Sequence, residues 1–532
     1  MSSSTPDLPA GLPLSRLPLS RLPLAGSPLA GSPLDGPLLG SPIRAPRGLA
    51  IASLCLALTA GCRSTPEPAA EAVEIDLPEA FSTLTGEDVE VGAEPWWTTF
   101  GNESLDRAVD GVLGGNFELR QAWSRLRQSE ASARAAGAPR IPSLDATGSA
   151  RYQEIDQNGG GGFNIPLRTG ETYSMGLSLG YEVDLFGRID STLKAARLEE
   201  AATAADVRAT GLALSGRAVD AWLTIVERNA LTDLVDAQIL AGEQLLELTE
   251  ARFATSGTGS ALDVLQQRRQ LEGTRAELPL LAGEVERARY QLAVLTGEAP
   301  GQQAADAPRA LPGLPPLPIL DVPSALLTRR PDVIAAGLRV ESADANVAAA
   351  IAARYPRLDL SAAYNFDANE LADIFDRTIS SIAANVVGPI IDGGARRAEV
   401  DRQRATLEGA IDAFNQSILA ALQEVEDALS LERRGLERIA VLELQETLAA
   451  QELIQARLRY AGGVESYLEV LAAVQTEQAL QRLLITERAG ILRARAQLLR
   501  ALGGSWTEEL KDPMAAAAPP ETPPAPSTLG PR

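Results

Sequence analysis

Hydrophobic and polar residues alternate strictly along 172–185, a pattern that predicts a β-strand with two different faces. The even positions of this segment are polar, acidic or glycine. The odd positions are Tyr173, Met175, Leu177, Leu179, Tyr181, Val183 and Leu185. Successive side chains on a strand point to opposite faces, so one face is apolar and the other polar. The apolar face requires an apolar partner.

Three further segments share this alternation, at 144–152, 357–366 and, more weakly, 382–390. We expect two hairpins, over 144–185 and 357–391. Most of the remaining sequence favours helix, so lipid is the partner that we predict for the apolar faces. We expect the lipid-facing side chains to include Tyr173, Leu177, Leu179 and Tyr181. A strand crosses a membrane only within a closed barrel of about eight or more strands. Four strands therefore imply a barrel shared between several copies of the chain.

The helical segments are long and carry coiled-coil spacing. Apolar residues between Val400 and Leu429 recur in steps of three, four and seven. The segment 188–248 contains no proline, and at 1.5 Å per residue such a helix is about 90 Å long. The heptads alone fit an antiparallel coiled coil, but the strand hairpins inserted between the helices favour a barrel that continues into a helical tube.

The chain is internally duplicated. Similar segments recur in the same order, Arg140–Asp145 with Arg354–Asp359, Asp184–Arg188 with Asp392–Arg396, and Leu262–Leu265 with Leu468–Leu471. Each half is predicted as helix, two strands, long helix, tight turn and helix. The predicted class is an α+β membrane protein. The expected repeats are 94–297 and 324–512, joined by a Pro-rich linker at 298–323, with a disordered tail at 513–532.

An apolar segment at 48–61 follows two arginines and ends in Leu58-Thr59-Ala60-Gly61 before Cys62. Its length suits the core of a signal peptide and is short for a transmembrane helix. Small residues before a cysteine resemble a bacterial lipobox, so we expect Cys62 to be acylated and to begin a tether at 62–93. An ordinary cleaved signal peptide or an uncleaved anchor is the alternative. The Pro-rich residues 1–47 are predicted to be a disordered extension or a misassigned start.

Composition narrows the functional class. The chain has 532 residues, a formal net charge of −22 and no histidine. The acidity argues against a nucleic-acid partner, and the lack of histidine excludes His-dependent acid–base and zinc chemistry. We find no catalytic constellation, and we expect no enzyme activity, cofactor or metal.

The sequence resembles TolC-like outer-membrane efflux proteins, in particular the lipoprotein branch that serves resistance-nodulation-division (RND) pumps. The resemblance covers about 94–510. Its markers are Trp96-Trp97-x-x-Phe100 with Leu105, Asn116–Leu119, Tyr181–Arg188, Arg252-Phe253, Arg329–Asp332 and Arg459-Tyr460-x-x-Gly463. It implies a homotrimer with a twelve-stranded barrel in the outer membrane of a Gram-negative bacterium, a periplasmic helical tube, a periplasmic adaptor protein and an RND inner-membrane pump.

The resemblance also assigns roles to the turns between the long helices. It implies that these turns form the periplasmic tip where an adaptor docks, through Gly257, Thr258, Gly259, Gly462 and Gly463. Glu469 matches an acid that rings the constriction in the family, whereas a second family acid is replaced here by Ala472.

Further expected residues of the constriction are Tyr460, Glu465, Tyr467 and Arg457. As an alternative, Glu469 is a solvated position or pairs with an arginine such as Arg457. Two other functions stay open at this point, a duct for type I protein secretion and a periplasmic coiled-coil scaffold without a pore.

Overall fold

A computed structural model describes residues 78, 80–81, 94–155, 168–255, 259–301, 307–318, 323–503 and 505–512. Cys62, Gly257 and Thr258 lie outside the described residues, as do the segments 1–61 and 513–532. The predictions made for them are therefore not addressed by the fold.

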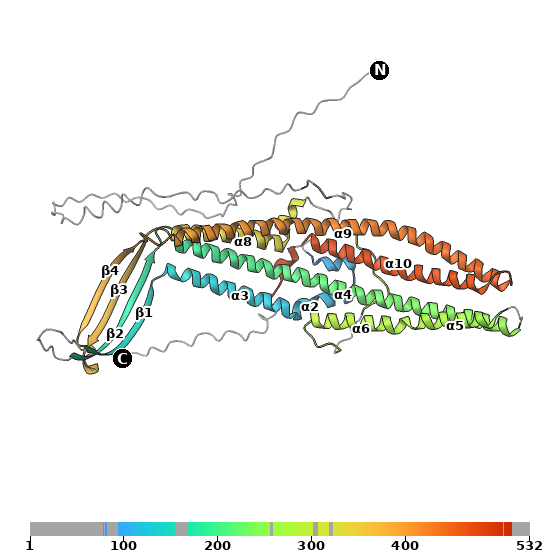
Figure 1. Cartoon of the computed structure of the whole chain (residues 1–532), viewed down its shortest axis with the longest axis horizontal. Coiled ribbons are helices and arrows are strands. Elements are labelled where there is room, and N and C mark those ends of the chain that lie inside the picture. Colours follow the sequence, from blue (N-terminus) through green and yellow to red (C-terminus); the bar gives the residue numbers. More distant parts are fainter. Residues whose placement is uncertain are drawn as a thin grey trace, which may run out of the picture. The chain divides into compact units, whose positions relative to one another are not determined.

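Four antiparallel strands form one sheet in sequence order, joining the two halves of the chain (Figure 1). The strands are β1 (Ser143–Ile155), β2 (Arg168–Val183), β3 (Arg357–Ala368) and β4 (Thr378–Val387). Both predicted hairpins are present, but the fourth strand begins and ends earlier than 382–390. The positions that would extend its apolar face, Thr378 and Ser380, are polar and hide the alternation, and pairing of Thr378 with Phe366 sets its start. Ile390 lies beyond the strand.

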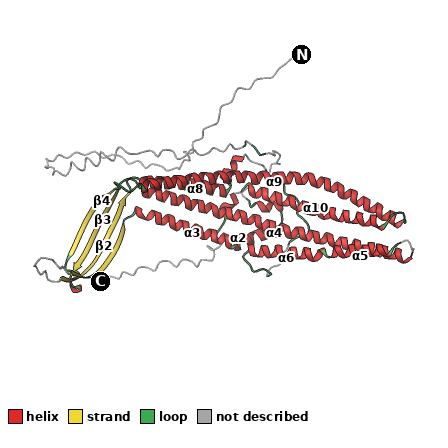
Figure 2. Ribbon diagram, viewed as in Figure 1, coloured by secondary structure: helices red, strands yellow, loops and turns green. Residues whose placement is uncertain are grey.

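Helices account for most of the remaining described residues (Figure 2). In the first half they are α2 (Glu103–Gly115), α3 (Phe117–Gly137), α4 (Arg188–Thr255), α5 (Ala261–Arg275) and α6 (Glu277–Leu295). In the second half they are α7 (Leu326–Arg329), α8 (Pro331–Ala352), α9 (Ala395–Ala461) and α10 (Tyr467–Ala501). Short 3₁₀ helices are η1 (Trp96–Phe100), η2 (Ala138–Arg140), η3 (Pro323–Ala325), η4 (Leu371–Asp373) and η5 (Ser505–Glu509).

The internal duplication is clearest in the two long helices, α4 and α9, which occupy equivalent places in the two halves. α4 has 68 residues and α9 has 67, which corresponds to about 100 Å each. Beside the sheet, α3, α4, α8 and α9 are neighbours in the order of the strands that they adjoin (Figure 1). Farther along, α4 packs on α5 and α6, and α9 packs on α10. The returning arm is one helix in the second half but two in the first, because the chain breaks at Ala276, with Pro279 in the first turn of α6.

None of the helices in the described part of the chain has an apolar stretch of the length and hydropathy that crossing a membrane requires.

Each strand-to-helix junction uses an aspartate and a glycine. Gly187 has φ +74°, a conformation that glycine adopts at little cost. Asp184 Oδ2 accepts a hydrogen bond at 2.8 Å from the backbone N–H of Asp190, in the first turn of α4. At the second junction, Asp392 accepts from the backbone N–H of Gly394 at 3.0 Å. The Asp-x-x-Gly and Asp-Gly-Gly motifs therefore shape the turns from strand to helix.

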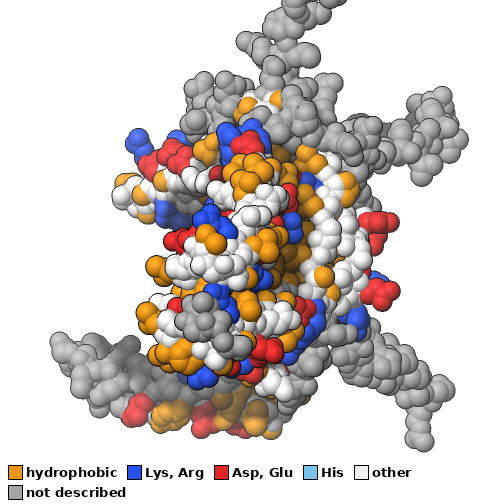
Figure 3. Space-filling model, turned by 90° about the vertical axis from the view of Figure 1, so that its right-hand side faces the viewer, with side chains coloured by type: hydrophobic (Ala, Val, Ile, Leu, Met, Phe, Trp, Pro, Cys, Tyr) orange, Lys and Arg blue, Asp and Glu red, His pale blue; other side chains and the backbone are white. Residues whose placement is uncertain are grey.

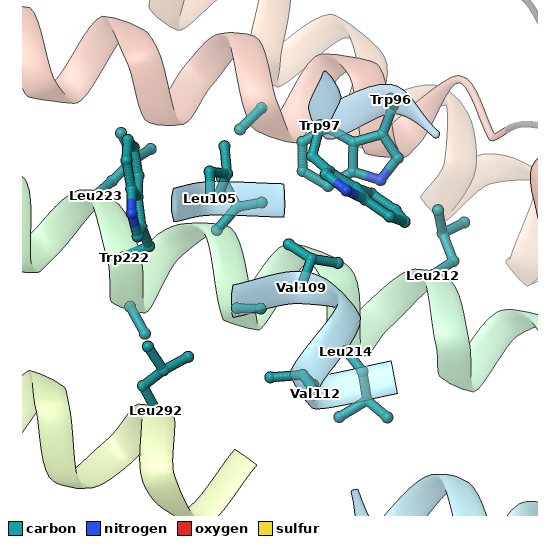
Figure 4. Packing of buried hydrophobic residues seen from close by; sticks show 14 of the residues in the cluster. Trp96, Trp97, Leu105, Val109, Val112, Leu212, Leu214, Trp222, Leu223 and Leu292 are labelled. Atoms are coloured by element: carbon teal, nitrogen blue, oxygen red, sulfur yellow. The ribbon is translucent and has the colours of Figure 1, made fainter. Parts of the chain in front are cut away.

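The main core lies where α2, α4 and α10 meet, and it contains the Trp-Trp marker (Figure 4). Trp96 Nε1 donates to Ser215 Oγ at 3.1 Å, and Trp222 Nε1 donates to Ser104 Oγ at 3.0 Å. These bonds satisfy the indole N–H groups of two buried rings, which a packed core requires. The N-terminal helices are thereby fixed to the middle of α4.

The Arg-Arg-Pro-Asp marker starts α8 and connects three helices. Pro331 occupies the first turn of α8, where its missing N–H and fixed φ are tolerated. The buried Arg330 guanidinium donates to Asp332 at 2.7 Å, to Glu424 at 3.0 Å and to the carbonyl of Ala501 at 3.2 Å. Burial acts to raise the pKa of Asp332, but the hydrogen bonds and charge of Arg330 outweigh it, so the pKa lies below its usual value. The start of α8 is thus joined to the middle of α9 and to the C-terminal end of α10.

Candidate functional site

One face of the sheet is apolar across all four strands. Opposed residues form cross-strand rows, one of which is Leu144, Leu179, Ala362 and Ile382. The next row contains Leu177 beside Tyr364. Leu177 is 48% exposed and Ile382 is 91% exposed, so no other element of the described chain covers this face. Large apolar side chains exposed over a whole sheet face mark a surface that is covered by something else. Contact of Tyr173, Leu177, Leu179 and Tyr181 with lipid stays a prediction.

The opposite face of the sheet is polar. Ser149 and Ser174 share a hydrogen bond of 2.7 Å across β1 and β2. A Cβ on Gly176 would lie 2.0 Å from Asn365 Oδ1, so the glycine gives the Asn365 amide room to lie across β2. The sheet therefore separates an apolar surface from a hydrophilic one.

The sheet is open, and its outer strands β1 and β4 each pair on one side only within the described chain. Their unpaired N–H and C=O groups are a template for pairing with another strand. Together with the uncovered apolar face, this makes the isolated sheet an incomplete unit.

Aromatic side chains lie at both ends of the strands. At the hairpin end, Phe366 contacts Tyr364 and Phe375 at centroid distances of 5.3 and 5.2 Å. At the helix end, Phe186 stacks on Tyr355 at 4.7 Å. Aromatic girdles at both interfaces are typical of transmembrane barrels.

The opposite end of the helices carries the predicted tip. In the second half, α9 ends in a Schellman motif, where Val464 N donates to Arg459 O and Gly463 N donates to Tyr460 O, both at 3.0 Å. Gly463 has φ +74°, so a side chain there would be strained. Viewed toward this end, hydrophobic, basic and acidic side chains are interspersed on the surface (Figure 3).

Two of the predicted constriction residues, Tyr460 and Tyr467, are buried inside the protomer. Their rings meet edge to face with centroids 5.7 Å apart. The Tyr467 hydroxyl donates to Gln267 Oε1 on α5, and burial raises its pKa. The Arg252 guanidinium from α4 lies over the Tyr460 ring, 4.0 Å from its centroid, and donates to the Tyr460 carbonyl. Both tyrosines therefore join the two helical hairpins.

The other predicted residues differ in their surroundings. Glu469, in the first turn of α10, is exposed, and within the described chain its carboxylate has no ion pair or hydrogen bond. Glu465 pairs with Arg459 at 2.9 Å. Arg457 opposes the effect of burial on Glu477, whose pKa is raised. The alternative pairing of Glu469 with Arg457 is not found among the described residues.

The first hairpin has a different tip. Ser260 caps α5 and forms a capping box with Asp263, in which each side chain accepts from the other residue's backbone N–H at 3.2 Å. Gly259 lies against the end of α4, where a Cβ would be 3.0 Å from Phe253 N.

Sequence reasoning did not identify Arg252 and Gln267 as partners of the tyrosines. Arg252 was noted only as part of a family marker. The chain gives no signal for contacts that link residues about 200 positions apart, because they arise when two hairpins pack side by side.

The chain is similar to known outer-membrane proteins over most of its length. The family model described as outer membrane efflux protein matches residues 108–298 and 322–504. The pyoverdine export outer membrane protein OpmQ of Pseudomonas aeruginosa is 33% identical over 469 residues, 87% of this chain and 98% of OpmQ. Outer membrane protein OprJ of the same species is 29% identical, over 86% of this chain and 96% of OprJ. The solved structure of the outer-membrane channel OprN has a TM-score of 0.75 and 30% identity, over 83% of this chain and 98% of that one.

Long helices joined to a small antiparallel sheet are thus the fold of an outer-membrane channel. The chain belongs to the outer membrane efflux protein family.

Proposed function

We propose that three copies of this chain form a passive duct through the outer membrane, for small molecules such as drugs or metal ions. The observation that carries the proposal is the open four-stranded sheet with one exposed apolar face and one polar face. Three such sheets, joined edge to edge, give twelve strands around one axis, enough for a barrel with lipid outside and water inside.

The long helices continue this duct into the periplasm. With the barrel in the membrane, their far ends lie about 100 Å away. We infer that the turns at Gly259 and at Gly462 and Gly463 dock a periplasmic adaptor, which couples the duct to an RND pump. Exposed apolar side chains near both turns, Leu262 (61%) and Leu468 (60%), give such a partner a surface to bury. The similarity to the pyoverdine exporter OpmQ supports small-molecule export.

Conductance tests the duct directly. The purified protein, added to a planar lipid bilayer, is expected to give discrete, stable current steps and to run as a trimer in mild detergent. A monomeric, non-conducting protein would contradict the proposal and favour a periplasmic scaffold.

The two sheet faces are tested by a pair of neighbouring substitutions. Leu177→Arg places a charge on the apolar face, where an arginine at the membrane midplane costs about 2–4 kcal/mol, so trimer yield should fall sharply. Ser178→Arg points to the polar face, and we expect it to assemble and to alter conductance. Equal behaviour of the two variants would show that the faces are assigned wrongly.

We also propose that Cys62 carries a lipid anchor, which rests on the lipobox-like residues before it. Cells supplied with a clickable palmitate analogue should label the wild-type protein and leave Cys62→Ser unlabelled. Equal labelling of both would remove the anchor from the proposal. Channel formation by Cys62→Ser is expected to persist, because the barrel inserts by its own apolar surface.

A further inference from the structure

Basic residues gather where the sheet meets the helices. Four segments flank this junction, 134–142, 188–198, 350–357 and 395–404. Together they contain eleven arginine or lysine residues and three acids, although the whole chain has a formal net charge of −22. Several of these cations pair with carboxylates of the same junction, as Arg188 does with Glu182 at 2.8 Å and Arg357 with Asp359 at 3.0 Å.

Two of these cations, Lys194 and Arg197, form no ion pair with any described residue. They line a surface pocket of about 260 Å³ with Arg140, Asp190, Leu193 and Leu198. The single acid is already engaged, since Arg140 donates to Asp190 Oδ1 at 2.6 and 3.0 Å. Lys194 and Arg197 are exposed, and no carboxylate of the described residues pairs with them. The pocket thus combines two available cations with an apolar floor.

The direction of α4 brings these cations toward the sheet. α4 begins at Arg188 beside the strands, and helical side chains lean toward the N-terminus of their helix. Lys194 lies about 9 Å along the axis from Arg188, and its long stem reaches back over part of that distance. The lipid headgroup layer extends about 5–8 Å beyond the hydrocarbon core, so the ammonium group falls within its reach.

Exposed apolar residues follow the pocket residue Arg140 in the chain. Arg140 is followed by Ile141 (70% exposed) and, four residues on, by Leu144 (66% exposed) in the apolar cross-strand row. An amphiphile at this position would have its charged group beside the cations and its chains against the strands.

We propose that this pocket binds the phosphate of a phospholipid headgroup in the leaflet nearest the helices. The Arg197 guanidinium offers paired N–H donors to phosphate oxygens, and Lys194 adds a mobile point charge. The acyl chains then lie along Ile141 and Leu144. The site rests on the proposed membrane orientation of the barrel, and it fixes how deep the trimer sits in the membrane.

The experiment measures lipid binding to the delipidated trimer in detergent by native mass spectrometry, with short-chain phosphatidylglycerol as the probe. The double variant Lys194→Gln/Arg197→Gln should bind about 30-fold more weakly, which corresponds to about 1 kcal/mol for each cation at an anionic lipid surface. The matched control is Arg269→Gln/Arg433→Gln, which removes two exposed arginines on α5 and α9, away from the sheet, that pair with no carboxylate of the described residues. Its affinity should equal that of the wild type.

Three outcomes would overturn the site. Equal lipid affinity in both double variants would show that the cations do not bind lipid. Competition by inorganic phosphate at the same concentrations would assign the pocket to a free anion. A changed ion selectivity in Lys194→Gln/Arg197→Gln would place the side chains in the lumen. Channel formation by the wild-type protein is measured separately, so failure of the lipid site is distinguished from failure of the duct.

Discussion

The two helical hairpins end in equivalent turns that use equivalent positions for different purposes. The match of Leu262–Leu265 with Leu468–Leu471 sets Asp263 against Glu469 and Ala261 against Tyr467. In the first hairpin the acid closes a capping box with Ser260, whereas in the second the acid has no partner in the described chain. In the first hairpin the small alanine is exposed, whereas in the second the tyrosine is buried.

The two hairpins also differ in how their tips are held in place. Tyr460 and Tyr467 rest on Arg252 and Gln267 of the first hairpin, so the second tip is positioned by side chains that it does not contain. The capping box of Ser260 and Asp263 stabilises the first tip locally. The second hairpin therefore carries an exposed acid that makes no bond in the described chain, and the first hairpin supports that tip.

The largest loss of stability at either tip is expected from Tyr467→Ala. Truncation of a buried aromatic side chain costs about 3–5 kcal/mol, and here it also removes the donor to Gln267. We expect trypsin to cleave at Arg459 much faster than in the wild type. The equivalent change in the first hairpin, Ala261→Gly, should cost only about 1 kcal/mol.

Tyr467→Phe separates the ring from the hydroxyl. It keeps the packing but leaves the buried Gln267 acceptor without this bond, a loss of about 1–3 kcal/mol. If Tyr467→Phe and Tyr467→Ala accelerated cleavage equally, the hydroxyl rather than the packed ring would position the tip.

A smaller loss of stability, confined to the start of α5, is expected from Asp263→Ala. Loss of the capping box costs about 0.5–2 kcal/mol and should fray the start of α5, seen as faster amide hydrogen exchange at its first turn. Glu469→Ala should change exchange at the start of α10 less, because Glu469 makes no such bond. If exchange increased more in α10 than in α5, Glu469 rather than Asp263 would be the acid that stabilises its helix.

The smallest change in stability, but a change in permeation, is expected from Glu469→Gln. Three carboxylates around a threefold axis attract cations, so their neutralisation should weaken cation selectivity and block by multivalent cations. Loss of the acid from the first turn of α10 costs at most about 1 kcal/mol. The control is Glu247→Gln, an exposed acid on α4 of the first hairpin, which should leave selectivity unchanged. Equal effects would mean that overall charge, and not a ring of Glu469, sets selectivity.

Much of the fold follows from local pattern. Alternation along 172–185 predicted β2 and its two faces, because the period of two is a property of any strand. The weak alternation before Ile382 hid the true start of β4, which pairing with β3 determines. At the tip, Gly463 could be predicted as a turn residue from its type, whereas the burial of Tyr460 could not, since its partner Arg252 belongs to another hairpin.

The sequence by itself determined the strand faces, the long helices and the positions of the turns, because each depends on residues close together in the chain. It also determined the duplication, because similar segments recur in the same order in both halves. Only the tertiary structure decided which of two equivalent acids takes part in a capping box and which makes no bond in the described chain. It also decided which tyrosines are buried and that Lys194 and Arg197 share a pocket with Arg140. These outcomes depend on the packing of α4 against η2 and of one hairpin against the other, distances that a linear pattern does not contain.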